Sequence, residues 1–441
     1  KIQKFRNKLV DEGYFNRLDT DVIARKLDQV ASFAQSPSMA RWSQIATSMG
    51  FGFTMGANVS SAAITLFDIP MSVFPYMSGE FGARKTTRAI SNGVKAFMKS
   101  PDFKTVTVMG ADGQPTKRIV KMGKYGKSLA NYDFDDPNLP PEVMRYKVLV
   151  ERGTDRAQFN QTMTQEQLDI SGNRDTLETI NKFSSFFFHH TERFGREASL
   201  ISMYDLELNK RSDNGKKELT SDDYIAAADK AIDAVELTLG GTASAGRPTW
   251  AQTPVGNVVY LFKRFAVQRY YYMAHLVDQV LSGADPETRK IARSQLAQIF
   301  IVSGALAGVG GMPMMGAIGA IYDMFSDDDE DDFEAMMRKT IGEGYYGGLA
   351  NEILGIDVAS RVSMNSLLYR APIVEKDQDR LWTMLEQLGG PVLGTYLSIS
   401  RGTNLLMEGE VQRGLEAILP AAARNGLKSI RFGTEGANTL R

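Results

Sequence analysis

The stretch TLETINKFSSFFFHHTERFGREASLISMYDLEL, residues 176–208, decides the fold of this 441-residue chain. Apolar or small side chains recur in it every three or four positions, at Leu177, Ile180, Ser184, Phe187, Thr191, Phe194, Ala198, Ile201 and, further on, Leu208. That period is typical of an amphipathic α-helix that turns one face toward a core. The spacing predicts a long helix from about Asp175 to Leu208.

Two further helices are indicated by the residues at their ends. Thr220 and Asp223 have the spacing of a capping box, and Gly240 follows the last residue of the apolar stripe. Asp285 and Pro286 mark another start, because proline at the first helical position gives up no hydrogen bond.

The one convincing strand pattern lies at residues 104–122. Valines alternate with threonines, and the turn-forming residues 111–115 separate them from Ile119 and Val120. The sequence therefore predicts an all-α protein, a multi-helix elongated assembly with one small β-hairpin inserted near residues 104–122.

Changes in composition along the chain predict four regions, since a chain of this length normally divides into several units. These regions are 1–103, an N-terminal helical region with an uncharged hairpin; 104–141, the β-hairpin and a Pro- and Asp-rich linker; 142–285, a central helical domain; and 286–441, a C-terminal helical region with a Gly-rich apolar run and an acidic block.

Residues 43–67 and 299–321 carry no charge, and each run is long enough to cross a bilayer as a helix. Glycines at GxxxG spacing in both runs allow close contact between helices, either in lipid or in a large helical core. Both settings stay open on the sequence alone. The candidate residues for membrane insertion or helix packing are Gly52, Gly56, Gly304, Gly308 and Pro313.

Two basic clusters are candidates for contact with phosphate groups. One follows the first uncharged run at roughly helical spacing, and the other is interleaved with aromatic residues, a mixture that suits nucleic acids or membrane interfaces. The alternative is an ordinary amphipathic helix with its charges in solvent. The candidate residues for contact with DNA or lipid headgroups are Arg84, Lys85, Arg88, Lys263, Arg264 and Arg269.

The composition restricts the chemistry that the chain can carry out. The formal net charge is −1, from 51 basic and 52 acidic residues, which argues against a dedicated nucleic-acid binder. The absence of cysteine excludes disulfides, thiolate metal sites and cysteine nucleophiles.

Metal and catalytic sites are not predicted. His189 and His190 are adjacent and point about 100° apart on a helix, so they cannot easily bind one ion. The acidic block at 327–332 lacks the alternation of a calcium loop and is typical of a solvated segment. No phosphate-binding loop, zinc-protease motif, dinucleotide fingerprint or nucleophile elbow is present. We therefore expect no enzyme activity, no catalytic residue, no metal ligand and no cofactor.

Several blocks of the second half occur in a distinctive order. They are RPTW at 247–250, TPVG at 253–256 leading into LFKRF at 261–265, the apolar Gly-rich run with its acidic block, GIDVASRVS at 355–363 and LPAAARNGLK at 419–428. Through these blocks, residues 176–441 resemble a helical region of the internal virion (ejection) proteins and large polyvalent proteins of short-tailed phages.

The resemblance implies a structural protein stored inside the virion that later helps to build an oligomeric conduit for the genome. Its implied partners are copies of itself, other ejection or core and portal proteins, DNA in transit without sequence specificity, and the host membrane. Its implied locations are the virion interior and, after ejection, the host periplasm and inner membrane. The alternative is a non-catalytic scaffold domain of a multi-enzyme phage polyvalent protein.

Overall fold

The computed structural model describes much of the chain, with gaps. The described residues are 46, 49–53, 56, 62, 65–109, 114–122, 126–156, 158–159, 176–213, 218–240, 251, 253–283, 285–313, 315, 318–319, 322, 333–342, 344–348, 380–420, 423–424 and 427. The prediction of an all-α protein with one inserted β-hairpin is confirmed. The acidic block at 327–332 and the block at 355–363 lie outside the described residues.

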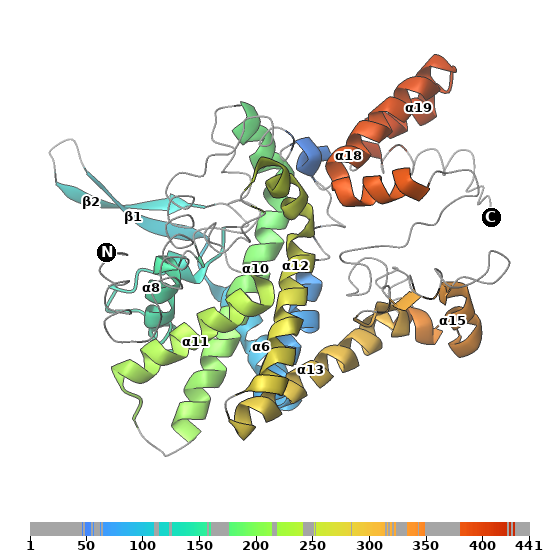
Figure 1. The fold of residues 1–441 in the computed structure, drawn as a ribbon. Coiled ribbons are helices and arrows are strands. Elements are labelled where there is room, and N and C mark those ends of the chain that lie inside the picture. Colours follow the sequence, from blue (N-terminus) through green and yellow to red (C-terminus); the bar gives the residue numbers. More distant parts are fainter. Residues whose placement is uncertain are drawn as a thin grey trace, which may run out of the picture.

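Helix α10, Thr176–Asp213, is the central element of the fold (Figure 1). It begins where the sequence predicts and continues past Leu208. Every residue from 195 to 208 is buried, so this half of the helix is covered all round and not along one stripe. The predicted stripe is therefore only part of its buried surface.

The described helices that precede α10 in the chain form the central body together with α10 and with α11, which follows it. Their bounds are Thr65–Phe67 (η1), Ile69–Val73 (η2), Phe74–Phe81 (α5), Ala83–Lys99 (α6), Leu129–Asn131 (η3), Pro141–Met144 (α7), Lys147–Asp155 (α8) and Ser221–Leu239 (α11). Helices α6 and α11 pack directly against α10, and α8 packs against α11.

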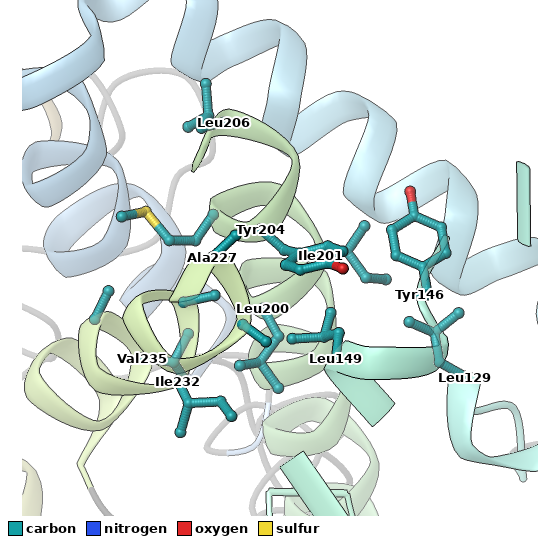
Figure 2. Packing of buried hydrophobic residues seen from close by; sticks show 14 of the residues in the cluster. Leu129, Tyr146, Leu149, Leu200, Ile201, Tyr204, Leu206, Ala227, Ile232 and Val235 are labelled. Atoms are coloured by element: carbon teal, nitrogen blue, oxygen red, sulfur yellow. The ribbon is translucent and has the colours of Figure 1, made fainter. Parts of the chain in front are cut away.

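The main hydrophobic core lies between these helices (Figure 2). Leu200, Ile201 and Tyr204 of α10 meet Leu149 of α8 and Ile232 of α11, and all five side chains are fully buried. Val73, Phe97 and Leu129 belong to the same cluster. The core thus draws residues from three of the four predicted regions.

The remaining described helices follow α11 in the chain. Their bounds are Pro254–Ser282 (α12), Pro286–Ala307 (α13), Val309–Gly311 (η6), Phe333–Ile341 (α15), Arg380–Met407 (α18) and Val411–Ile418 (α19). Helix α13 packs along α5 and α12, which joins this half of the chain to the central body.

The predicted helix starts are confirmed. The Thr220 side chain accepts a hydrogen bond from the Asp223 backbone N–H, and the Thr220 N–H donates to the Asp223 carboxylate at 3.0 Å. Gly240, with φ of 86°, ends α11 in a conformation that favours glycine. Asp285 caps α13 by accepting from the Thr288 N–H at 2.7 Å.

Strands β1, Phe103–Met109, and β2, Pro115–Lys121, form an antiparallel hairpin in which Val106 lies opposite Arg118. The hairpin projects from the side of the helical body (Figure 1). The predicted linker after it is folded back, since Tyr132 and Phe134 pack against the main core.

Candidate functional site

Helix α6 carries a stripe of exposed cations. Arg84, Arg88, Lys95 and Lys99 are all exposed, and at 3.6 residues per turn they lie within about 60° of one another around the helix axis. Lys85 is exposed beside this stripe. The helix contains no aspartate or glutamate that would offset these charges. We call Arg84, Arg88, Lys95 and Lys99 the α6 stripe.

The opposite face of α6 fixes the direction of the stripe. Thr86, Ala89, Gly93 and Phe97 are buried on that face. A Cβ atom at Gly93 would lie 2.6 Å from the Ala198 carbonyl oxygen of α10, so only glycine lets the two backbones come this close.

An aromatic contact completes the packing of α6 on α10. The Phe97 and Phe194 rings meet edge to face, with their centroids 5.3 Å apart. Both helices are therefore held at one distance and one rotation, and the α6 stripe faces away from the body.

The dimensions of the stripe suit a polyanion. From Arg84 to Lys99 the helix rises about 22 Å, at 1.5 Å per residue. Phosphates on one strand of B-DNA follow one another about every 3.4 Å along the axis, so a duplex offers several phosphates over this length.

The second basic cluster has a different environment. Arg264 and Arg269 are 4% and 6% exposed. Arg269 pairs with the Asp68 carboxylate, and the Arg264 guanidinium lies 5.9 Å from the centre of the Tyr260 ring. Both are enclosed in this conformation, so of the six candidates the structure places Arg84, Lys85 and Arg88 on the surface. The Lys263 side chain lies outside the described part of the structure.

Buried charges on α10 are a feature that the sequence analysis missed. Arg196 is 1% exposed and donates to the Gln158 side chain at 2.9 Å and the Gly240 carbonyl at 3.0 Å. Glu197 is fully buried and accepts from the Ser128 hydroxyl at 2.8 Å and the Leu129 N–H at 2.9 Å. These hydrogen bonds satisfy the Glu197 carboxylate and the two terminal guanidinium nitrogens of Arg196, which a helical pattern would place in solvent.

A four-residue ion cluster joins α5, α10 and α11. Glu80 accepts from Lys210 and Lys230, each at 2.7 Å, and Lys230 also pairs with Glu207 at 2.6 Å. Burial alone would raise the pKa of Glu80, but the two lysines lower it overall. Glu80, Lys210, Lys230 and Glu207 are paired with one another, so we interpret the cluster as structural.

The two adjacent histidines lie in a partly buried part of α10. Burial lowers the pKa of both His189 and His190 to about 4, and the nearby Arg193 adds to the effect. Both imidazoles are therefore neutral at pH 7. Among the described residues, no three His, Asp or Glu side chains are grouped so that they could hold a metal ion.

The glycines of the second uncharged run allow close contacts, with backbone at Gly308 and with a side chain at Gly304. Helix α13 ends at Ala307, and Gly308, which follows it, has a φ of 67°. A Cβ atom there would lie 2.6 Å from the Gly348 amide nitrogen, and one at Gly304 would lie 2.6 Å from the Met312 Cε. Pro313 is buried beyond the break.

In the first run, described only in part, a Cβ atom at Gly56 would collide with the Gly52 backbone. The second run does not form one continuous helix, because the turn Val309–Gly311 follows Gly308. Of the helices that the structure describes, none combines the length and hydropathy needed to cross a membrane.

The exposed cations of α6 are suited to non-covalent binding of anions. Comparisons with protein-family models, curated proteins and solved structures gave no match to this chain.

Proposed function

We propose that this chain is a structural component of the genome-ejection machinery of a short-tailed phage, within an oligomeric assembly that conducts DNA across the host envelope. The α6 stripe is the observation that carries this proposal. It is an exposed row of cations, without intervening carboxylates, on a helix held rigidly against the core.

The charge distribution suits DNA that passes through without being retained. Four or five phosphate contacts give weak, sequence-independent and salt-sensitive binding. The chain as a whole carries a formal charge of −1, so the surface outside the stripe adds little further attraction. The resemblance of residues 176–441 to ejection proteins supports the same assignment.

The assembly is tested first. The purified chain is imaged by negative stain and sized by analytical ultracentrifugation, alone and with a long linear duplex. We expect rings or tubes with a central channel. A particle that stays monomeric with and without DNA would contradict the conduit and favour a scaffold domain.

The role of the α6 stripe is tested by DNA binding. In the variant Arg84→Gln/Arg88→Gln/Lys95→Gln/Lys99→Gln, we expect duplex affinity to fall by about one to three orders of magnitude at low salt, because each lost phosphate contact removes counterion release. The slope of the logarithm of the binding constant against the logarithm of salt concentration should become less negative by about 3 to 4.

A matched control removes four exposed cations from other helices. The variant Lys290→Gln/Arg293→Gln/Arg401→Gln/Arg413→Gln has the same change in net charge. Equal losses in both variants would show that binding follows net charge, and the α6 stripe would then have no special role.

A further inference from the structure

The projecting hairpin has no structural role in the core. Within the described residues, β1 and β2 pair only with each other, and every residue of β2 is exposed. A hairpin of two strands is marginally stable by itself in water. Its exposed side chains are therefore available to a partner.

One face of the hairpin combines large apolar side chains with lysines. Opposed residues in an antiparallel pair point to the same face, and the register places Phe103 opposite Lys121 and Met109 opposite Pro115. Ile119, opposite Thr105, lies between Lys117 and Lys121 on that face. We call Phe103, Met109, Lys117, Ile119 and Lys121 the hairpin patch.

The apolar members of the hairpin patch are well exposed. Ile119 is 70% exposed, Met109 68% and Phe103 47%. The two strands contain no aspartate or glutamate. Lys117 pairs with Asp133 at 2.8 Å, yet its side chain remains 62% exposed.

We infer that the hairpin patch docks on the surface of an anionic bilayer. Apolar side chains that enter the headgroup boundary, flanked by lysines that meet lipid phosphates, are the combination that binds such an interface. This is attachment at the surface and not a membrane span. The inference adds a membrane-contact site to the proposed function. It rests on that function, which supplies the reason why this chain would meet a bilayer.

Two other partners fit the hairpin patch less well. A DNA interface is polar and needs cations more than exposed isoleucine or methionine. Edge-to-edge pairing of two copies through β2 would bring like charges at Lys117, Arg118 and Lys121 close together, which destabilises strand pairing. The anionic lipid surface satisfies both the apolar and the cationic side chains.

The test is flotation of the full chain with vesicles of phosphatidylcholine that contain about 30% phosphatidylglycerol, and with pure phosphatidylcholine vesicles. We expect co-flotation with the anionic vesicles alone. The variant Met109→Thr/Ile119→Thr, which keeps strand-forming residues, should reduce partitioning at least about 10-fold. Lys117→Gln/Lys121→Gln should reduce it by about 10-fold.

Matched controls change equally exposed residues elsewhere. Leu281→Gln/Met407→Gln removes apolar side chains that are 78% and 82% exposed, and Lys290→Gln/Arg293→Gln removes two cations. Both controls should float as the wild type does. Equal losses in the controls, or unchanged flotation of both hairpin variants, would overturn the inference.

Other readouts separate the possible partners. Hairpin variants that lose duplex binding but keep vesicle binding would assign the patch to DNA. Variants that lose self-association but keep vesicle binding would assign it to a second copy. Rings that bind DNA but do not bind vesicles would support the proposed function and overturn this inference. A monomer that binds vesicles through the hairpin patch would support this inference and contradict the proposed function.

Discussion

At the scale of single residues, burial decides what a charged or titratable side chain does. His189 and His190 have a pKa of about 4, below the usual 6.5, because burial disfavours the imidazolium. The unfolded chain therefore binds protons first on acidification. The stability that the neutral histidines provide is complete above pH 6.5 and is lost as the pH falls toward 4.

We expect the double variant His189→Gln/His190→Gln to lose less stability than the wild type on acidification. Because both imidazoles are only partly enclosed, the expected difference is about 1 to 2 kcal/mol between pH of about 7 and about 5. Urea unfolding at both pH values measures it, with His275→Gln as the control. The same pH dependence in wild type and double variant would show that neither histidine is linked to folding.

At the scale of elements, the α6–α10 contact depends on one missing side chain. Gly93 lies against Ala198 and Ser202, with backbone atoms of α10 where a Cβ would be. Those atoms cannot move aside as a flexible side chain would. The direction of the α6 stripe therefore depends on Gly93.

The variant Gly93→Ala should be less stable than the wild type by about 1 to 3 kcal/mol, since the added methyl group pushes the helices apart. That cost exceeds the gain of about 1 kcal/mol that alanine normally brings to a helix interior. Urea unfolding measures the difference, with the exposed neighbour Asn92→Ala as the control. A Gly93→Ala protein at least as stable as the wild type would contradict the close packing.

The elements also show what the sequence could predict. Thr220 with Asp223, and Asp285 with Pro286, mark helix starts by contacts within four residues, so the local pattern is sufficient. The spacing of Arg84 and Arg88 is also local information, because residues four apart lie on the same side of a helix. The TPVG block at 253–256 has a local structural role as well. Thr253 caps helix α12 by accepting a hydrogen bond from the Gly256 N–H at 3.1 Å.

What the sequence missed depends on distant partners. Arg269 finds Asp68 across 201 positions of the chain, and Glu197 finds Ser128 across 69. No local period contains that information, so the sequence pattern could not predict either of these pairs. The same reason explains why Arg264 and Arg269 were placed with the exposed Arg84 and Arg88.

At the scale of the whole molecule, the hairpin and the helical body are separable. The main core contains no residue of β1 or β2. The chain on both sides of the hairpin is anchored, by Phe97 before it and by Leu129 after it. We therefore expect the body to keep its packing when the hairpin is removed, although the Lys117–Asp133 ion pair is lost.

Replacing residues 103–121 by a short Gly–Ser linker should change the thermal midpoint by less than about 2 °C, because the strands bury little and a short loop closes at small entropic cost. Calorimetry or circular dichroism measures the midpoint. A broad transition or a much lower midpoint would show that the hairpin helps to hold the body together.

The buried charges of α10 also affect how the molecule responds to temperature. Exposing apolar surface on unfolding raises the heat capacity, whereas exposing polar groups such as Arg196 and Glu197 lowers it. A core that encloses both kinds of group has a smaller heat-capacity change than an all-aliphatic core of equal size. We therefore expect the stability of the central body to change less steeply with temperature, toward both cold and heat, than that of an all-aliphatic core of equal size.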